Sequence, residues 1–258
     1  MTDFVHLHVH SQYSLLDGAA SLERLVAETV ATGQKAVALT DHGVMYGAFK
    51  FYQAATAAGI KPVIGCEVYV ANRSRYDREA KIDDDPYHLV LLVENEQGYK
   101  NLTKLVSLGH LEGFYYRPRV DREILAEHAD GLIALSACLS GEIPTHLLAG
   151  DYAAAEKTAA WYRDVFGPQN FFLELQNQGL EGQRQLNRDL ATLAQALELE
   201  LVATNDLHYI KREDAMVHDV LLCIQTGKTI NDPQRMKFPT DEFYFKTGEE
   251  MARAFPEF

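Results

Sequence analysis

The sequence predicts an α/β protein and favours a closed barrel of seven strands over an open sheet. Short apolar runs rich in β-forming residues alternate with segments of helical spacing, which is typical of βα units with helices outside a parallel sheet. Ionisable residues fall at the ends of many runs, as in barrels that build one site at their mouth. The G-x-G-x-x-G fingerprint is absent, which weakens the alternative of a doubly wound sheet.

The expected elements follow one another along the chain. We expect strands at residues 5–10, 36–40, 61–70, 88–93, 132–136, 171–176 and 201–204. We expect helices at residues 21–32, 48–58, 97–108, 121–127, 152–166, 182–197 and 213–226. Two polar stretches are expected to be loops: a charged one at 72–86 and a basic, aromatic one at 113–121.

The last part of the chain differs from this rhythm. We expect residues 1–230 to form the barrel and residues 231–258 to form a connector. The connector contains a strand-like EFYFK and a short helix, for which Thr247 and Glu250 form a capping-box pattern. The chain stops soon after this helix begins, which we interpret as an end within a longer polypeptide.

Composition excludes several classes of protein. Hydrophobic residues make up 47% of the 258 residues, which is typical of a globular protein, and the net charge is −13. That charge argues against a surface that grips duplex DNA by itself. No apolar run approaches the roughly 20 residues that span a bilayer, so we expect no membrane partner. The three cysteines have no paired spacing, which indicates a reducing cytoplasm.

Three histidines alternate with apolar residues in the first expected strand. His6, His8 and His10 therefore share one face, which is the interior of a barrel. Three stacked imidazoles are hard to satisfy by hydrogen bonds alone, and a metal ion can supply the missing partner. We expect His6, the deepest, to be a core residue, and we expect His8 and His10 to be metal ligands.

The last expected strand repeats this pattern with Asp206 and His208, which are also two residues apart. A carboxylate and an imidazole at this separation can hold one metal ion or two neighbouring ones. The first and last strands meet when a barrel closes, so the two pairs are expected to lie together.

Other candidate ligands lie near the intervening strands: Asp17, His42, Glu67, His88 and Cys138. Each has a plainer interpretation, such as a turn aspartate, a strand-edge charge or a small buried thiol. His88 begins a strand, which is the wrong end for a simple parallel barrel. The convergence of these residues favours a metal site, with Asp41 expected to support its neighbour His42.

Several motifs carry a family resemblance. HLHVHS, LTDHG, GCEVYV, YHLVLLVEN, LSACLSGE and ATNDLHY resemble the PHP (polymerase and histidinol phosphatase) superfamily. EGFYYRPRVD, FFLELQNQG and TGKTINDPQRMKFPTDEFYFKTGEEM are similar to the N-terminal PHP domains of bacterial replicative DNA polymerase III alpha subunits. The resemblance covers essentially the whole chain, in order. It implies a distorted (β/α)7 barrel related to the TIM barrel.

The resemblance also implies three divalent metal ions with nine ligands. His8, His10, Glu67 and Asp206 would hold the first ion, and Glu67 would bridge to a second held by His88 and Cys138. Asp17, His42 and His208 would hold the third. This mixture of imidazole, carboxylate and thiolate suits zinc, manganese or iron rather than magnesium alone.

The implied activity is metal-dependent phosphoester hydrolysis, in this family 3′–5′ exonuclease proofreading on a DNA 3′ end. A hydroxide activated by metal would attack phosphorus, so no side-chain nucleophile is expected. We hypothesise that Arg117 and Arg119 bind phosphate or the DNA backbone; alternatively their loop contacts another part of the polymerase. Tyr115 and Tyr116 could stack on a terminal base, although packing of the loop is the plainer interpretation.

Two other functions remain open. The domain could be structural, stabilising the rest of the alpha subunit or docking a separate proofreading exonuclease subunit, since metal ions contribute to folding in either case. A small-molecule phosphatase of the histidinol phosphatase type is disfavoured by the polymerase-like tail. The catalytic carboxylates of polymerases of this family belong to a palm domain beyond Phe258, so we expect no DNA synthesis from this chain alone.

Overall fold

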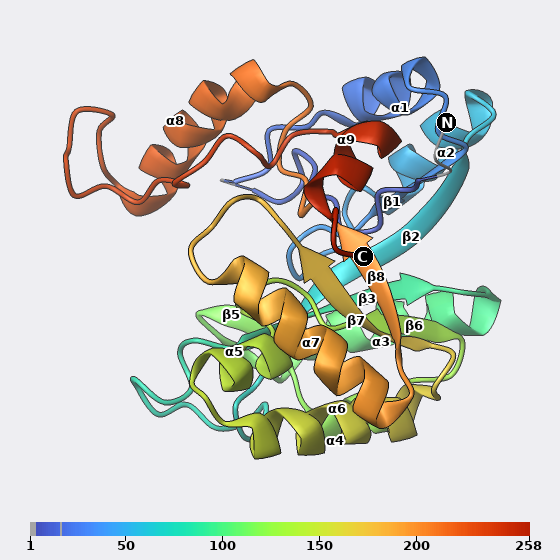
Figure 1. Cartoon of the computed structure of the whole chain (residues 1–258), viewed down its shortest axis with the longest axis vertical. Helices are drawn as coiled ribbons and strands as arrows, with labels where there is room; N and C mark the ends of the chain where they lie inside the picture. Colours follow the sequence, from blue (N-terminus) through green and yellow to red (C-terminus); the bar gives the residue numbers. More distant parts are fainter. Residues whose placement is uncertain (1–3, 16) are drawn as a thin grey trace.

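The computed structural model describes residues 4–15 and 17–258 (Figure 1). Residues 1–3 and 16 of the expected barrel lie outside this described part. Within it, an 8-stranded sheet has the order β4-β5-β2-β3-β6-β7-β8, with β1 paired to β2. The strands are β1 (Ala36–Leu39), β2 (Lys61–Val70), β3 (Tyr87–Val93), β4 (Phe114–Tyr115), β5 (Arg117–Val120), β6 (Leu132–Leu135), β7 (Phe171–Gln176) and β8 (Glu200–Thr204).

The first segment, residues 6–10, closes the sheet into a ring. On one side, the Ala38 amide donates to the His6 carbonyl at 2.8 Å and the Thr40 amide to the Val9 carbonyl at 2.9 Å. On the other side, the His10 amide donates to the Leu207 carbonyl at 2.7 Å. With this irregular segment counted as a strand, the described chain forms a distorted barrel of seven strands, as predicted. The other six barrel strands are β1, β2, β3, β6, β7 and β8.

One of the barrel strands runs against its neighbours, which corrects the expectation of a parallel barrel. β3 is antiparallel to both β2 and β6. The reason lies in the connection from β2, which is a loop without a helix, so that the chain folds straight back. As a result the start of β3 lies beside the end of β2, with His88 opposite Tyr69.

The helices cover the outside of the barrel (Figure 1). α1 and α2 pack near β1 and β2, α6 and α7 lie against β6 and β7, and α5 packs on α6, α7 and β3. The helices are α1 (Leu22–Ala31), α2 (Ala48–Ala57), α3 (Glu96–Leu111), α4 (Arg122–Glu127), α5 (Glu142–Leu148), α6 (Tyr152–Phe166), α7 (Gln183–Leu197), the 3-10 helix η1 (Arg212–Asp214), α8 (Ala215–Thr226) and α9 (Gly248–Ala254). In the described residues, no helix is long and apolar enough to cross a membrane.

Two elements differ from the expectations. α5 was not expected, because its seven residues, EIPTHLL, include a proline and are too few to show a helical period. The predicted loop at 113–121 contains a small hairpin of β4 and β5, which turns at Tyr116 with a φ of 58°.

The final segment packs onto the barrel. Phe245 joins the core formed by α1, α2 and β1, and Met251 and Phe255 join the larger core beneath α6 and α7. Thr247 and Glu250 form the expected capping box at the start of α9. The role of residues 231–258 as a connector toward a further domain stays a prediction.

Candidate metal centre

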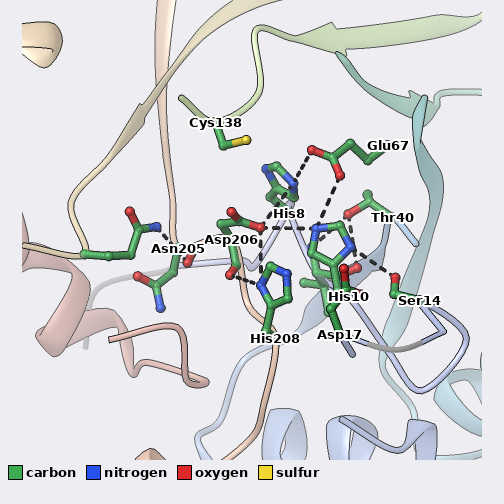
Figure 2. Close-up of polar contacts among 12 residues, drawn as sticks. His8, His10, Ser14, Asp17, Thr40, Glu67, Cys138, Asn205, Asp206 and His208 are labelled. Atoms are coloured by element: carbon green, nitrogen blue, oxygen red, sulfur yellow. Dashed lines mark hydrogen bonds and ion pairs between the residues drawn. The ribbon is translucent and has the colours of Figure 1, made fainter. Parts of the chain in front are cut away.

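The nine predicted ligands gather around one end of the barrel, and Figure 2 shows His8, His10, Asp206 and His208 directed toward one another. Many come from segments that are far apart in the sequence and that meet only when the ring closes. An open cavity of about 360 Å³ lies over them. Its lining includes Asp17, His42, Glu67, His88, Cys138, Asp206 and His208, together with Tyr69, Asp84, Asp85, Pro86 and Arg117.

The first group brings together residues from the first segment of the barrel and from the segment that follows its last strand. His8 Nε2 lies 3.4 Å from Asp206 Oδ1, and His10 Nε2 lies 3.1 Å from the same oxygen. Glu67 completes the group, with Oε1 3.3 Å from His8 Nε2. Asp206 adopts a φ of 49°, a left-handed conformation that is unfavourable for a residue other than glycine and that is often found at functional sites.

The second group contains Glu67, His88 and Cys138. His88 Nδ1 lies 2.8 Å from Glu67 Oε1 and 3.7 Å from Cys138 Sγ. His88 lies at the start of its strand, which in a parallel barrel would place it at the opposite end from the other ligands. Because β3 is antiparallel, its start lies at the same end as they do. Cys138 follows Ala137, whose φ of 63° turns the chain directly after the β6 region.

The third group contains Asp17, His42 and His208. His42 Nε2 lies 3.1 Å from Asp17 Oδ2, and its Nδ1 contacts Glu67 Oε2. The His42 ring stacks on His10 with centroids 3.9 Å apart, and the His208 ring lies 4.5 Å from His10. The ring nitrogens of these three histidines lie within 4.8 Å of one another.

The donor atoms fit a metal site. Four buried atoms of these groups make ion-pair contacts with one another but no hydrogen bond among the described residues: His8 Nε2, His10 Nε2, Glu67 Oε2 and Asp206 Oδ1. Buried polar atoms are rarely left unsatisfied in native proteins. A divalent ion would satisfy all four at once, and imidazole, carboxylate and thiol donors together suit zinc, manganese or iron.

Charge coupling supports the same interpretation. Burial alone would raise the pKa of Glu67. The imidazoles of His88 and His42 nevertheless hold this pKa well below its usual value. Burial and the neighbouring His42 and His208 lower the pKa of His10 to about 3, so this imidazole is neutral and able to donate a lone pair. Burial raises the pKa of the Cys138 thiol, so a metal ion would have to displace its proton.

A second layer of buried groups orients His8. Glu174 Oε1 lies 2.7 Å from His8 Nδ1 and also contacts Gln176 and Thr204. A proton held on Nδ1 leaves Nε2 free for a metal ion. Sequence reasoning missed Glu174, although an acidic residue inside the apolar strand FFLELQ was a usable signal.

Asp41 contacts its neighbour His42 indirectly, through a serine hydroxyl. Its carboxylate accepts bonds from the Ser11 amide at 2.7 Å and from the Ser14 hydroxyl at 2.8 Å. Because the Ser14 hydroxyl donates to Asp41, it can accept from His10 Nδ1, 3.2 Å away. Ser14 Oγ also accepts the His42 amide at 3.1 Å. Asp41 therefore supports both histidines through Ser14 rather than contacting the His42 ring directly.

The two predicted substrate-binding arginines differ in position. Arg117 lines the cavity, with its guanidinium 5.6 Å from the Tyr69 ring centroid. Arg119 is fully buried, and its guanidinium bonds to main-chain carbonyls, because the loop after β2 folds over it. The prediction that Arg119 contacts a substrate is therefore not supported by its surroundings.

Two further histidines lie close to the nine. His6 is buried and its Nε2 bonds to the Lys246 carbonyl at 2.8 Å, in agreement with the expected core role. His218, on α8, is buried with its ring 5.4 Å from His208 and 4.5 Å from Phe238. We interpret His218 as a packing residue behind His208.

Comparisons with known proteins agree with these observations. A family model described as the PHP domain matches residues 6–178. A DNA polymerase III subunit alpha from Treponema pallidum is 53% identical over 256 residues, which is 99% of this chain and 22% of that protein. The one from Thermus aquaticus is 50% identical over 258 residues, covering 98% of this chain and 21% of that protein. The chain thus spans about a fifth of the length of these curated relatives.

Among solved structures, an amidohydrolase from Chromobacterium violaceum aligns with a TM-score of 0.44 and 16% identity. The alignment covers 79% of this chain and 87% of that one.

Proposed function

We propose, from the premise that this chain belongs to the PHP domain family, that it is a metal-dependent phosphoesterase acting on the 3′ end of DNA. The observation that carries the proposal is that candidate ligands converge beside one open cavity. Three clusters each bring their donor atoms within 4.8 Å of one another: His8 with His10 and Asp206, His10 with His42 and His208, and Glu67 with His88 and Cys138. Buried donor atoms that make no hydrogen bond lie beside that cavity, and the cavity is large enough to admit a phosphoryl group and part of its ester. A purely structural metal site would be closed to solvent.

The residues favour three divalent ions, of zinc, manganese or iron. Glu67 belongs to the first and second groups. Its Oε1 lies 3.3 Å from His8 Nε2 and 2.8 Å from His88 Nδ1, and its Oε2 contacts His10 and His42, so it suits a bridging role. His42 and His208 extend the cluster toward Asp17. Divalent ions bound there would supply Lewis acidity and neutralise charge on the phosphoryl oxygens.

The residues of the chain have separate tasks in this proposal. Glu174 holds the proton on His8 Nδ1, and the Asp41–Ser14 pair does the same for His10. These contacts keep both Nε2 atoms directed into the site before substrate arrives. Arg117, on the cavity wall, is positioned to bind a non-bridging phosphate oxygen through its guanidinium.

The relatives suggest the larger context. Because the chain matches about a fifth of DNA polymerase III alpha subunits, we propose that it works as part of such a subunit in the cytoplasm. The remaining polymerase domains, a proofreading exonuclease subunit and a DNA 3′ end are its proposed partners. Proofreading 3′–5′ exonuclease activity is the specific reaction that we propose.

A structural role is the second candidate, and one observation favours it. His8 and His10 lie on the first barrel segment and Asp206 lies beyond the last strand, so metal ions bound between them would stabilise ring closure without any reaction. The domain would then stabilise the polymerase or dock its proofreading partner.

One experiment distinguishes the phosphoesterase from the structural role. It determines metal content and hydrolysis on the same sample. Purified chain would be assayed by plasma mass spectrometry and with a 3′-mismatched primer and a simple phosphodiester. The test variant is Asp206→Asn, and the matched control is Asp130→Asn, which removes an exposed carboxylate outside the cavity.

Two or three metal ions per chain, with hydrolysis that only Asp206→Asn loses, would support the phosphoesterase. Bound metal with no turnover in any sample, and an Asp206→Asn variant that merely unfolds more easily, would favour the structural role instead.

A further inference from the structure

The loop between β2 and β3, residues 71–86, forms one wall of the metal cavity. Asp84, Asp85 and Pro86 line the same space as the candidate ligands His88 and Glu67. We call residues 83–86 the acidic wall. It brings two carboxylates to the rim of a cavity whose proposed substrate is an anion.

The acidic wall is held in place by Arg119. The guanidinium of this buried residue donates to the carbonyls of Arg75 at 3.1 Å, Asp77 at 2.7 Å and Asp83 at 2.9 Å, all within the loop. Its Nε donates to the Gly113 carbonyl at 3.0 Å, which ties the loop to the β4–β5 hairpin.

Arginines at the base of the loop reinforce this arrangement. Arg75 donates to Asp121 at 3.1 Å and to Glu112 at 2.8 Å. Arg73 pairs with the buried carboxylate of Asp83 at 2.5 Å. The loop is thus fixed by internal bonds at several points, including one from the Lys81 amide to Asp84 Oδ2 at 3.0 Å. Asp84 and Asp85 line the cavity from this supported backbone.

These contacts exclude Arg119 from binding substrate. Its Nε, Nη1 and Nη2 atoms all donate to main-chain carbonyls, and the side chain is shielded from solvent. Without Arg119, the carbonyls it joins would lose their shared partner and the loop would lose its anchor. Its position explains why a basic residue is needed there although it does not reach the cavity.

The charge of the acidic wall has a consequence for selectivity. A phosphate at the cavity floor would be attracted by bound metal ions, whereas a second negative group near the rim would face Asp84 and Asp85. Like charges repel at short range, so they raise the free energy of a complex whose ligand has a second negative group at the rim more than that of a complex whose ligand lacks one.

We propose that Arg119 is a positioning residue that holds the acidic wall, and that Asp84 and Asp85 on this wall make the site reject strand ends with extra negative charge on the terminal nucleotide. The inference rests on the proposed function. It specifies the substrate class as single strands with a free 3′-hydroxyl, and it excludes strands that end in a 3′-phosphate.

A binding assay tests this selectivity without requiring turnover. The manganese-loaded chain would be titrated into thymidine pentamers that carry a 5′-fluorescein label and a phosphorothioate as their last linkage. One pentamer ends in a 3′-hydroxyl and the other in a 3′-phosphate. Fluorescence anisotropy gives the ratio of the two dissociation constants. The variant is Asp84→Asn with Asp85→Asn, and the matched control is Glu156→Gln with Glu200→Gln, two exposed carboxylates outside the cavity.

We expect the wild-type chain and the control to bind the 3′-phosphate strand about ten-fold more weakly at low salt, because its extra negative charge is repelled by the two carboxylates. The double variant should bring the ratio close to one. An unchanged ratio in the double variant would overturn the role of the acidic wall. If manganese binds but neither strand does, the proposed function fails, and the wall proposal fails with it.

The role of Arg119 has its own test. Arg119→Met should lower the same ratio and should speed tryptic cleavage after Arg78 or Lys81 in the loop, while Arg119→Lys should restore part of both effects. If Arg119→Met keeps the wild-type ratio and cleavage rate, the positioning role is wrong. A general loss of fold in Arg119→Met would be visible by circular dichroism, and the ratio measured for Arg119→Lys would then decide.

Discussion

The metal centre and the acidic-wall loop are both rich in charged groups, but they satisfy those groups in opposite ways. Beneath the loop, the buried guanidinium of Arg119, on β5, has a carbonyl oxygen for each of its nitrogen atoms. In the metal centre, the buried atoms His10 Nε2 and Asp206 Oδ1 lie 3.1 Å apart as an ion-pair contact, and neither makes a hydrogen bond within the described residues. The difference teaches that a completed polar network marks a scaffold, whereas an incomplete one marks a place for a ligand.

Removal of metal would break this comparison most strongly. We expect chelation with EDTA to reduce phosphodiester hydrolysis at least about a hundred-fold, because the metal ions supply the Lewis acid. The melting temperature should fall by about 10 °C if the metal was present at a thousand times its dissociation constant. Hydrolysis rates and calorimetry, before and after manganese is restored, measure both effects. A chain that keeps full activity after complete metal removal would contradict the metal centre.

Exchange of the two arginines for methionine tests the same contrast at the level of single residues. Arg119→Met should lower the free energy of unfolding by about 3 kcal/mol, because it leaves buried carbonyls without donors. Arg117→Met should change it by less than about 0.5 kcal/mol and instead raise the KM for a phosphodiester. Urea denaturation and steady-state kinetics provide the measurements. Equal stability losses in the two variants would remove the distinction between them.

Glu174→Gln tests the buried hydrogen-bonded groups that orient the candidate ligand His8. The amide cannot hold the His8 Nδ1 proton as a carboxylate does, so we expect manganese affinity to fall about 10–100-fold. Isothermal titration calorimetry measures the affinity. The matched control is Glu142→Gln, which changes a carboxylate that pairs with Arg122 away from the cavity. A similar loss of affinity in the control would show that the effect is not specific to His8.

Ser14→Ala should have the smallest effect. It removes the hydroxyl that links Asp41 to His10, at a cost of about 1 kcal/mol, which corresponds to a loss of roughly five-fold in metal affinity. Manganese titration measures this change. Ser107→Ala, which removes a helical surface hydroxyl, should leave the affinity unchanged.

Much of the fold was predictable because it depends on local patterns. The alternation of His6, His8 and His10 with apolar residues identified a barrel segment whose backbone is too irregular to form a regular strand. Helices of ten residues or more followed their apolar spacing, and α6 has the predicted bounds. α5 was missed because it is too short to establish a period.

The remaining errors concern partners that are distant in sequence. The burial of Arg119 depends on a loop that folds back over it, and no periodicity describes that contact. The reversed direction of β3 was signalled by the helix-free connection before it, although the alternation of strands and helices elsewhere favoured a parallel sheet. Of the candidate site, the strand motifs and the family resemblance predicted nine ligand positions, which the structure brings to one end of the barrel, whereas Glu174 and Ser14 required the three-dimensional structure.

The closure of the ring by residues 6–10 has a consequence for biogenesis. The bridge between Val9 and Leu207 joins positions about 200 residues apart, so it is among the most non-local contacts in the molecule. A ribosome adds about 5–20 residues per second, so the first barrel segment must wait roughly 10–40 s before its neighbour has been synthesised. His8 and His10 therefore emerge early but cannot meet Asp206 until most of the chain exists. Assembly of the metal centre is a late event in the maturation of the chain, not a nucleus around which it folds.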